Sequence, residues 1–149
     1  PCADKYWNQP DQSGHLSVPG TALPHSPLQT VKNFLPPIGE ARALRNRDMT
    51  ANINDICAPL DRSLDYDKDV LPISCVGEGG SVTERHLLFA LAHKLMTAYG
   101  KGRDLLTVLR EKLLLSIPEK TALLLIDEEN PYYDYDLLGL LKAELVSKI

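Results

Sequence analysis

The sequence predicts a mostly α protein: a bundle of four to six helices with an irregular, proline-rich N-terminal arm. Apolar residues recur every three or four positions over most of residues 38–149, as they do on one side of a helix. Seven of the 11 prolines fall within residues 1–37, where such periodicity is nearly absent. We therefore divide the chain into an extended arm, residues 1–37, and a helical domain, residues 38–149.

The bulk composition is typical of a soluble globular protein with one core. The chain has 149 residues, of which 44% are hydrophobic and 24% charged. Its net charge of −4 argues against a general nucleic-acid-binding surface. There is no long uncharged apolar run, so we expect no membrane span. No basic segment followed by an apolar one opens the chain, and we expect a cytoplasmic protein.

Three cysteines, Cys2, Cys57 and Cys75, are far apart in the sequence. An odd number without a Cys-x-x-Cys pair supports neither a zinc site nor a disulfide framework, and it favours reduced thiols. A single Cys57–Cys75 bridge is the alternative, and it requires the two Cα atoms to lie within about 7 Å.

The arm is predicted to be irregular because each proline removes a hydrogen-bond donor and restricts the residue before it. A short turn of helix is compatible with residues 28–35. The arm either lies along the surface of the core or pairs with a partner or another part of a larger protein.

The first long helix is predicted from Ile38 to Cys57, with Pro59 ending it. It carries a small basic cluster, which fits a solvent-exposed side or a contact with a phosphate or carboxylate. The cluster consists of Arg42, Arg45 and Arg47.

An acidic turn follows, in which Asp65, Asp67 and Asp69 alternate with other residues. Alternate carboxylates can converge on calcium. An EF-hand loop then needs Gly at its sixth position and Glu at its twelfth, where this chain has Val70 and Val76. We therefore interpret the turn as structural, and predict a short extended segment at residues 70–73.

Residues 79–100 are predicted to form the central helix. Ser81 and Glu84 have the spacing of a capping box, and Gly100 stands where the helix needs a left-handed residue. Leucines dominate its apolar stripe, which is broad enough to need covering on more than one side. His86 and His93 are about 10 Å apart along the axis, too far to share one metal ion. We expect no metal ligand and no cofactor in this chain.

Three further helices are predicted after the central one, and the first and the last of them are expected to cover it. They span residues 103–115, residues 116–126 after a start at Ser116 or Ile117, and residues 130–147 with Asn130 as cap and Pro131 in the first turn. The first is joined to the central helix by a short linker, which predicts an antiparallel hairpin.

Four segments carry a resemblance to a known family. They are residues 43–47 taken with 52–54, residues 64–72, residues 82–86 and residues 129–139. Together they resemble an α-helical insert of some uncharacterised proteins of the PHP (polymerase and histidinol phosphatase) type, over residues 40–149. Those proteins are metal-dependent, phosphoesterase-like barrels, and any divalent metal would belong to the parent enzyme. This chain lacks the family's His-x-His, so no metal ligand is carried over.

The resemblance implies a non-catalytic helical domain of a larger PHP-like hydrolase, which shapes or covers its site. Glu84, Arg85 and His86 would then face the substrate cleft, and the partners would be other domains of the larger chain. The alternative is a stand-alone helical module that binds a protein partner. A small enzyme in its own right is disfavoured, because no nucleophile, base and orienting residue can be assembled from the sequence.

Overall fold

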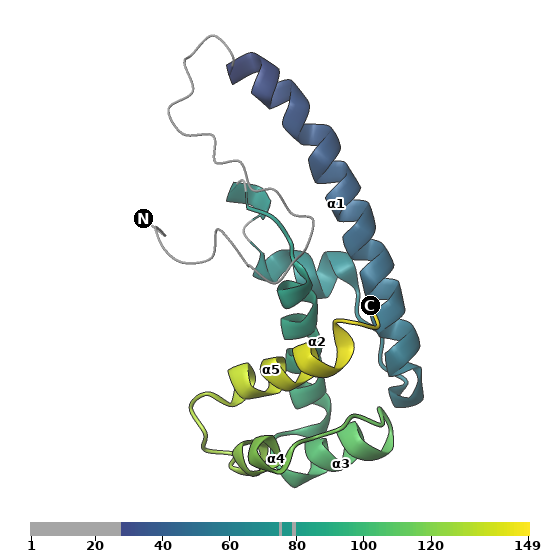
Figure 1. Cartoon of the computed structure of the whole chain (residues 1–149), viewed down its shortest axis with the longest axis vertical. Coiled ribbons are helices and arrows are strands. Elements are labelled where there is room, and N and C mark those ends of the chain that lie inside the picture. The colour runs from purple at the N-terminus through teal and green to yellow at the C-terminus, as the bar shows by residue number, and fades with distance from the viewer. Residues whose placement is uncertain (1–27, 75, 79) are drawn as a thin grey trace. The chain divides into compact units, whose positions relative to one another are not determined.

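The computed structural model describes residues 28–149, except Cys75 and Gly79. Over these residues it contains five α-helices, joined by turns, and no strand (Figure 1). The mostly α, helical fold class is therefore confirmed. None of the described helices is long and apolar enough to cross a membrane. Their bounds are Leu28–Cys57 for α1, Glu84–Tyr99 for α2, Arg103–Glu111 for α3, Glu119–Ile126 for α4 and Tyr133–Leu145 for α5.

Helix α1 begins well before the predicted start at Ile38, and it continues through Pro36 and Pro37. Neither proline can donate to the carbonyl four residues earlier, but the φ that each ring imposes is helical, so the helix can run on at a cost. The rest of the predicted arm, residues 1–27, lies outside the described residues. The chain divides at Pro36, and residues 37–149 form one compact unit. The core and the cleft reported below lie within this unit.

Two asparagines of α1 attach later parts of the chain to it. The Asn54 side chain donates to the Leu64 carbonyl (3.0 Å) and accepts from the Leu64 N–H (2.6 Å). The buried Asn46 donates from Nδ2 to the Val82 carbonyl at 3.1 Å. These side-chain amides bind backbone groups of Leu64 and Val82 that would be paired with other backbone groups in a helix or a strand. Together they fix the entry and exit of the segment between α1 and α2.

This segment is a series of short helical turns, so the predicted extended segment at residues 70–73 is wrong. Asp65 caps η2, because its Oδ1 accepts from the N–H groups of both Asp67 and Lys68 at 3.0 Å. The turn that follows buries Tyr66 and Val70. The turns are η1 (Ala58–Leu60), η2 (Tyr66–Val70, π-helical), η3 (Leu71–Ile73) and η4 (Val76–Glu78).

The cap of α2 differs from the predicted Ser81–Glu84 box. The residue before the helix is Thr83, whose N–H donates to Nδ1 of His86 at 3.1 Å. The Thr83 hydroxyl also lies 3.0 Å from that nitrogen. The helix starts later than predicted because Val82 is buried and its carbonyl is held by α1, which keeps this stretch extended. A tertiary contact thus overrides the local capping signal.

The central position predicted for α2 is confirmed. Both α3 and α5 pack against α2, and α4 packs against α3 and α5 (Figure 1). Leucines from these helices form the core between them. Removing one leucine side chain from water contributes about 1.5–3 kcal/mol, so these leucines dominate the stability of the unit. Its fully buried leucines are Leu87, Leu88, Leu95, Leu105, Leu109, Leu125, Leu137, Leu141 and Leu145.

The C-terminal helices are shorter than predicted. Helix α3 ends at Glu111, not at Leu115, because Leu114 has a φ of +51° and turns the chain. This reversal leaves Leu114 exposed and lets both Leu113 and Leu115 reach the core. Before α5, the Asn130 side chain accepts from the Tyr132 N–H at 2.9 Å. It therefore stabilises the turn before the helix and not the first helical turn itself.

Gly102, at the start of α3, gives a direct test of the fold. Its φ is +85°, and its N–H donates to the Tyr133 hydroxyl at 2.9 Å. A Cβ at Gly102 would meet Glu128 Oε1 at 2.5 Å. We expect Gly102→Ala to lower the free energy of unfolding by about 1–2 kcal/mol, chiefly through the unfavourable φ.

The matched control is Gly139→Ala, because Gly139 lies inside α5 with nothing within 4 Å of an added Cβ. That change should raise the free energy of unfolding by about 0.5–1 kcal/mol. Urea unfolding of both variants measures the difference. Effects of the same sign at the two glycines would contradict the described geometry.

Candidate functional site: a cleft between η2, η3 and α2

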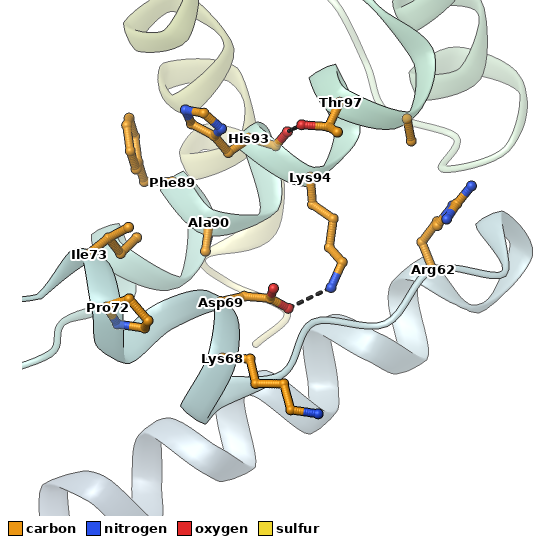
Figure 2. A pocket seen from close by; sticks show the side chains of 11 residues that line it. Arg62, Lys68, Asp69, Pro72, Ile73, Phe89, Ala90, His93, Lys94 and Thr97 are labelled. Atoms are coloured by element: carbon orange, nitrogen blue, oxygen red, sulfur yellow. Dashed lines mark hydrogen bonds and ion pairs between the residues drawn. The ribbon is translucent and has the colours of Figure 1, made fainter.

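A cleft of about 630 Å³ lies between the turns η2 and η3 on one side and α2 on the other (Figure 2). Its size is within the range of about 300–1,000 Å³ that is usual for ligand pockets. Two rows of α2 residues, each spaced by four positions, form one wall. The lining consists of Arg62, Lys68, Asp69, Pro72, Ile73, Phe89, Ala90, His93, Lys94, Thr97 and Ala98.

The acidic turn shapes this cleft, but its three carboxylates do not converge. Asp65 accepts from backbone N–H groups of its own turn. Asp67 pairs with Arg47, and Asp69 pairs with Lys94. No group of three or more metal-ligating side chains occurs among the residues that the structure describes. Over these residues the three carboxylates of the turn act as caps and ion-pair partners within the chain.

The pair between Arg47 and Asp67 attaches η2 to α1. Both guanidinium nitrogens donate to the carboxylate at 2.8 Å, a bidentate geometry. The same guanidinium lies over the Tyr66 ring, 4.7 Å from its centre. The hydrogen bond from Arg47 holds the pKa of Asp67 below its ordinary value. One member of the predicted basic cluster thus contacts a carboxylate of this chain.

The pair between Lys94 and Asp69 spans the cleft itself. Lys94 Nζ lies 2.5 Å from Asp69 Oδ2, and the two side chains are 33% and 28% exposed. Asp69 Oδ2 also accepts from the Asp65 N–H at 2.7 Å. Burial raises the pKa of Asp69, but the hydrogen bonds from Lys94 and Asp65 outweigh it, and the net pKa is lowered.

The lining has two chemically different parts. Pro72, Ile73 and Phe89 form an apolar wall, and Arg62, Lys68 and Lys94 form a cationic rim. Figure 2 shows Phe89, Ile73 and Pro72 on one side of the Lys94–Asp69 pair and Arg62 on the other. Phe89 and the exposed His93 have ring centres 5.6 Å apart at 56°. Across the whole lining, three Lys or Arg side chains stand against one carboxylate. The cleft is therefore suited to an anion that carries an apolar part.

The residues predicted to face a substrate, Glu84, Arg85 and His86, do not line this cleft. Arg85 is exposed, Glu84 is half-buried, and the His86 ring is engaged in the α2 cap. Whether these residues meet a neighbouring domain stays a prediction. Of the two histidines on α2, His93 is the one at the cleft.

Sequence reasoning missed the cleft because its two sides are far apart in the chain: Asp69 and Lys94 are separated by 25 positions. One signal was present. On α2, Phe89, His93 and Thr97 follow one another at spacing four on the side away from the leucines, and a large aromatic residue there indicates a second contact side and not plain solvent exposure.

Cys57 is a free, buried thiol in the described part of the chain, and Cys75 lies outside it. Burial raises the pKa of Cys57 to about 11, so the thiol stays protonated and unreactive at neutral pH.

No family model matches this chain, and no curated protein or solved structure shows significant similarity to it.

The Lys94–Asp69 pair predicts a pH dependence of stability. The folded-state pKa of Asp69 lies below the ordinary value of 3.8, so the carboxylate adds stability above that pH and loses it as the pH falls through the lower folded value. We expect Asp69→Asn to cost about 0.5–1 kcal/mol near neutral pH. The deficit should shrink in urea unfolding at acid pH, and Lys94→Met should show a similar trend. If the free energy of unfolding of Asp69→Asn stays below that of the unmodified protein by the same amount at acid pH, the ion pair is not the cause.

Proposed function

We propose that the helical unit, residues 37–149, is a protein-interaction module, and that its cleft binds an acidic partner segment with apolar side chains. The observation that carries this proposal is the combination in one cleft of a cationic rim with an apolar wall. The chain as a whole has a net charge of −4, so this cationic lining is a local feature. Charges beyond about 8–10 Å are largely screened in physiological salt, and the local set governs docking.

The spacing of the rim cations favours a partner segment with several carboxylates rather than a single compact anion. They come from three elements: Arg62 precedes η2, Lys68 lies in η2, and Lys94 lies in α2. Figure 2 shows the charged end of Lys94 turned toward Asp69, while those of Lys68 and Arg62 point in other directions. An extended segment places acidic side chains at intervals along its length and can meet such separated charges.

Arg62 is the cation most available to a partner. It is exposed, and no carboxylate lies within 4.0 Å of it among the described residues. Lys68 lies 3.7 Å from Asp65, but its side chain is 83% exposed, so this pair holds it only weakly. A partner carboxylate can therefore pair with Arg62 without first breaking an ion pair.

The apolar wall would supply most of the affinity. Ile73 is 42% exposed and Phe89 half-buried, although both are large apolar residues. Covering such surface contributes about 25 cal/mol per Å². The charged rim would fix the position of the segment and discriminate against basic ones.

The test is a titration of the ¹⁵N-labelled protein with a pool of short capped peptides that alternate Asp or Glu with Phe, Leu or Ile. A matched pool carries Asn and Gln in place of the acids. We expect the acidic pool to shift the amide signals of Phe89, His93 and Thr97, with an affinity about tenfold higher than the neutral pool. Equal binding of the two pools, or shifts confined to other helices, would contradict the proposal.

Arg62→Gln should weaken binding of the acidic pool by about fivefold, because it removes an available cation from the rim. Arg110→Gln is the matched control, since Arg110 is exposed on α3 and does not line the cleft. Equal loss in both variants would point to the net charge of the protein and not to the cleft.

The resemblance to a PHP-type insert supports a second proposal, in which the module belongs to a larger metal-dependent hydrolase. Arg85, exposed in the first turn of α2, is then the residue best placed to contact a neighbouring domain. Reading the gene on both sides of this segment tests it. An in-frame continuation with His-x-His would support the proposal, whereas a start codon directly before Pro1 and a stop after Ile149 would rule it out.

A further inference from the structure

We propose that Asp69 holds, in the unbound protein, the position that a partner carboxylate takes on Lys94, so that the cleft recognises its ligand by carboxylate exchange. This inference rests on the proposed function of the same cleft. It assigns Lys94 as the specificity-determining cation and Asp69 as an internal competitor. It also narrows the recognised group to a carboxylate.

The position of the pair supports exchange. Lys94 comes from the middle of α2, and Figure 2 shows it reaching across to Asp69, between the apolar wall and Arg62. A segment that contacts both the wall and Arg62 must therefore pass this pair. Both side chains are about one-third exposed, so a ligand can reach the ammonium group without opening the core.

Asp69 does not depend on Lys94 for its place. Its Oδ2 accepts the Asp65 N–H at 2.7 Å, and its own N–H donates to the Asp65 carbonyl at 2.8 Å. When Lys94 turns to a ligand, the Asp69 carboxylate keeps a hydrogen-bond donor and some contact with water. The exchange therefore leaves neither charge buried and unpaired, which is the costly outcome in such sites.

The exchange favours one chemistry over others. A ligand carboxylate forms a new ion pair with Lys94 in place of the one with Asp69. A neutral amide cannot form that ion pair, so its binding affinity is lower by the ion pair that is lost. Asp69 thus raises specificity while it lowers affinity. If Asp69 only held Lys94 in place for binding, its removal would lower the affinity for the acidic segment instead of raising it.

The variant that separates these roles is Asp69→Asn, which keeps the size of the side chain and its capacity to accept from Asp65. We expect it to bind the acidic peptide pool about three- to fivefold more tightly than the unmodified protein. Asp67→Asn is the matched control: it removes a carboxylate two positions away that pairs with Arg47 and does not line the cleft. Its affinity for the pool should rise by less than twofold.

Equal or weaker binding by Asp69→Asn, with binding by the unmodified protein intact, would overturn the exchange and leave the proposed function standing. Absence of binding by both proteins would overturn the two together. A direct readout needs no variant: the ¹³C signal of the Asp69 carboxyl group should move when the unmodified protein is saturated with the acidic pool. If that signal stays fixed while the Phe89 and Thr97 amides shift, exchange at Lys94 is excluded.

Discussion

The burial of the leucine side of α2 is the constraint on which the other elements depend. Leu87, Leu91 and Leu95 are at most 3% exposed, and each contributes about 1.5–3 kcal/mol by leaving water. This burial requires α3 and α5 to pack against α2, and α4 packs in turn against α3 and α5. Because two neighbours cover only part of a helix, α2 retains another side, which carries Phe89, His93 and Thr97. That side meets the turns that follow α1.

Those turns bury Tyr66 and Val70 in the core, and polar contacts hold the parts of them that border the cleft. Asn54 binds the backbone of Leu64, Arg47 binds Asp67, and Lys94 binds Asp69. Such contacts act at points and hold two elements at a set distance, whereas interdigitating leucines would close the gap to normal packing density. The apolar groups between the points, of which Phe89 is the largest, keep partial access to solvent.

The sequence was sufficient for features with a local cause. The helical spacing of leucines identified the class, the order of the C-terminal helices and the central place of α2, and Gly100 ends that helix with a positive φ as predicted. It was insufficient where a distant contact decides. The cap moved from Ser81 to Thr83 because Asn46 of α1 holds the Val82 carbonyl. The cleft depends on Asp69 meeting Lys94, and no local pattern encodes that contact.

The acidic turn also explains how a protein with net charge −4 comes to have a cationic cleft. Asp65, Asp67 and Asp69 are close together, and their mutual repulsion favours cations around them. Lys68, Arg47 and Lys94 are those cations, each paired with a different carboxylate. Of the acidic side chains only Asp69 lines the cleft, whereas Lys68 and Lys94 both do. Two of the three carboxylates of the turn thus lie outside the cleft, whereas two of the cations that pair with the turn line the rim of the cleft. The structural role of the carboxylates and the anion preference of the cleft therefore have the same physical origin.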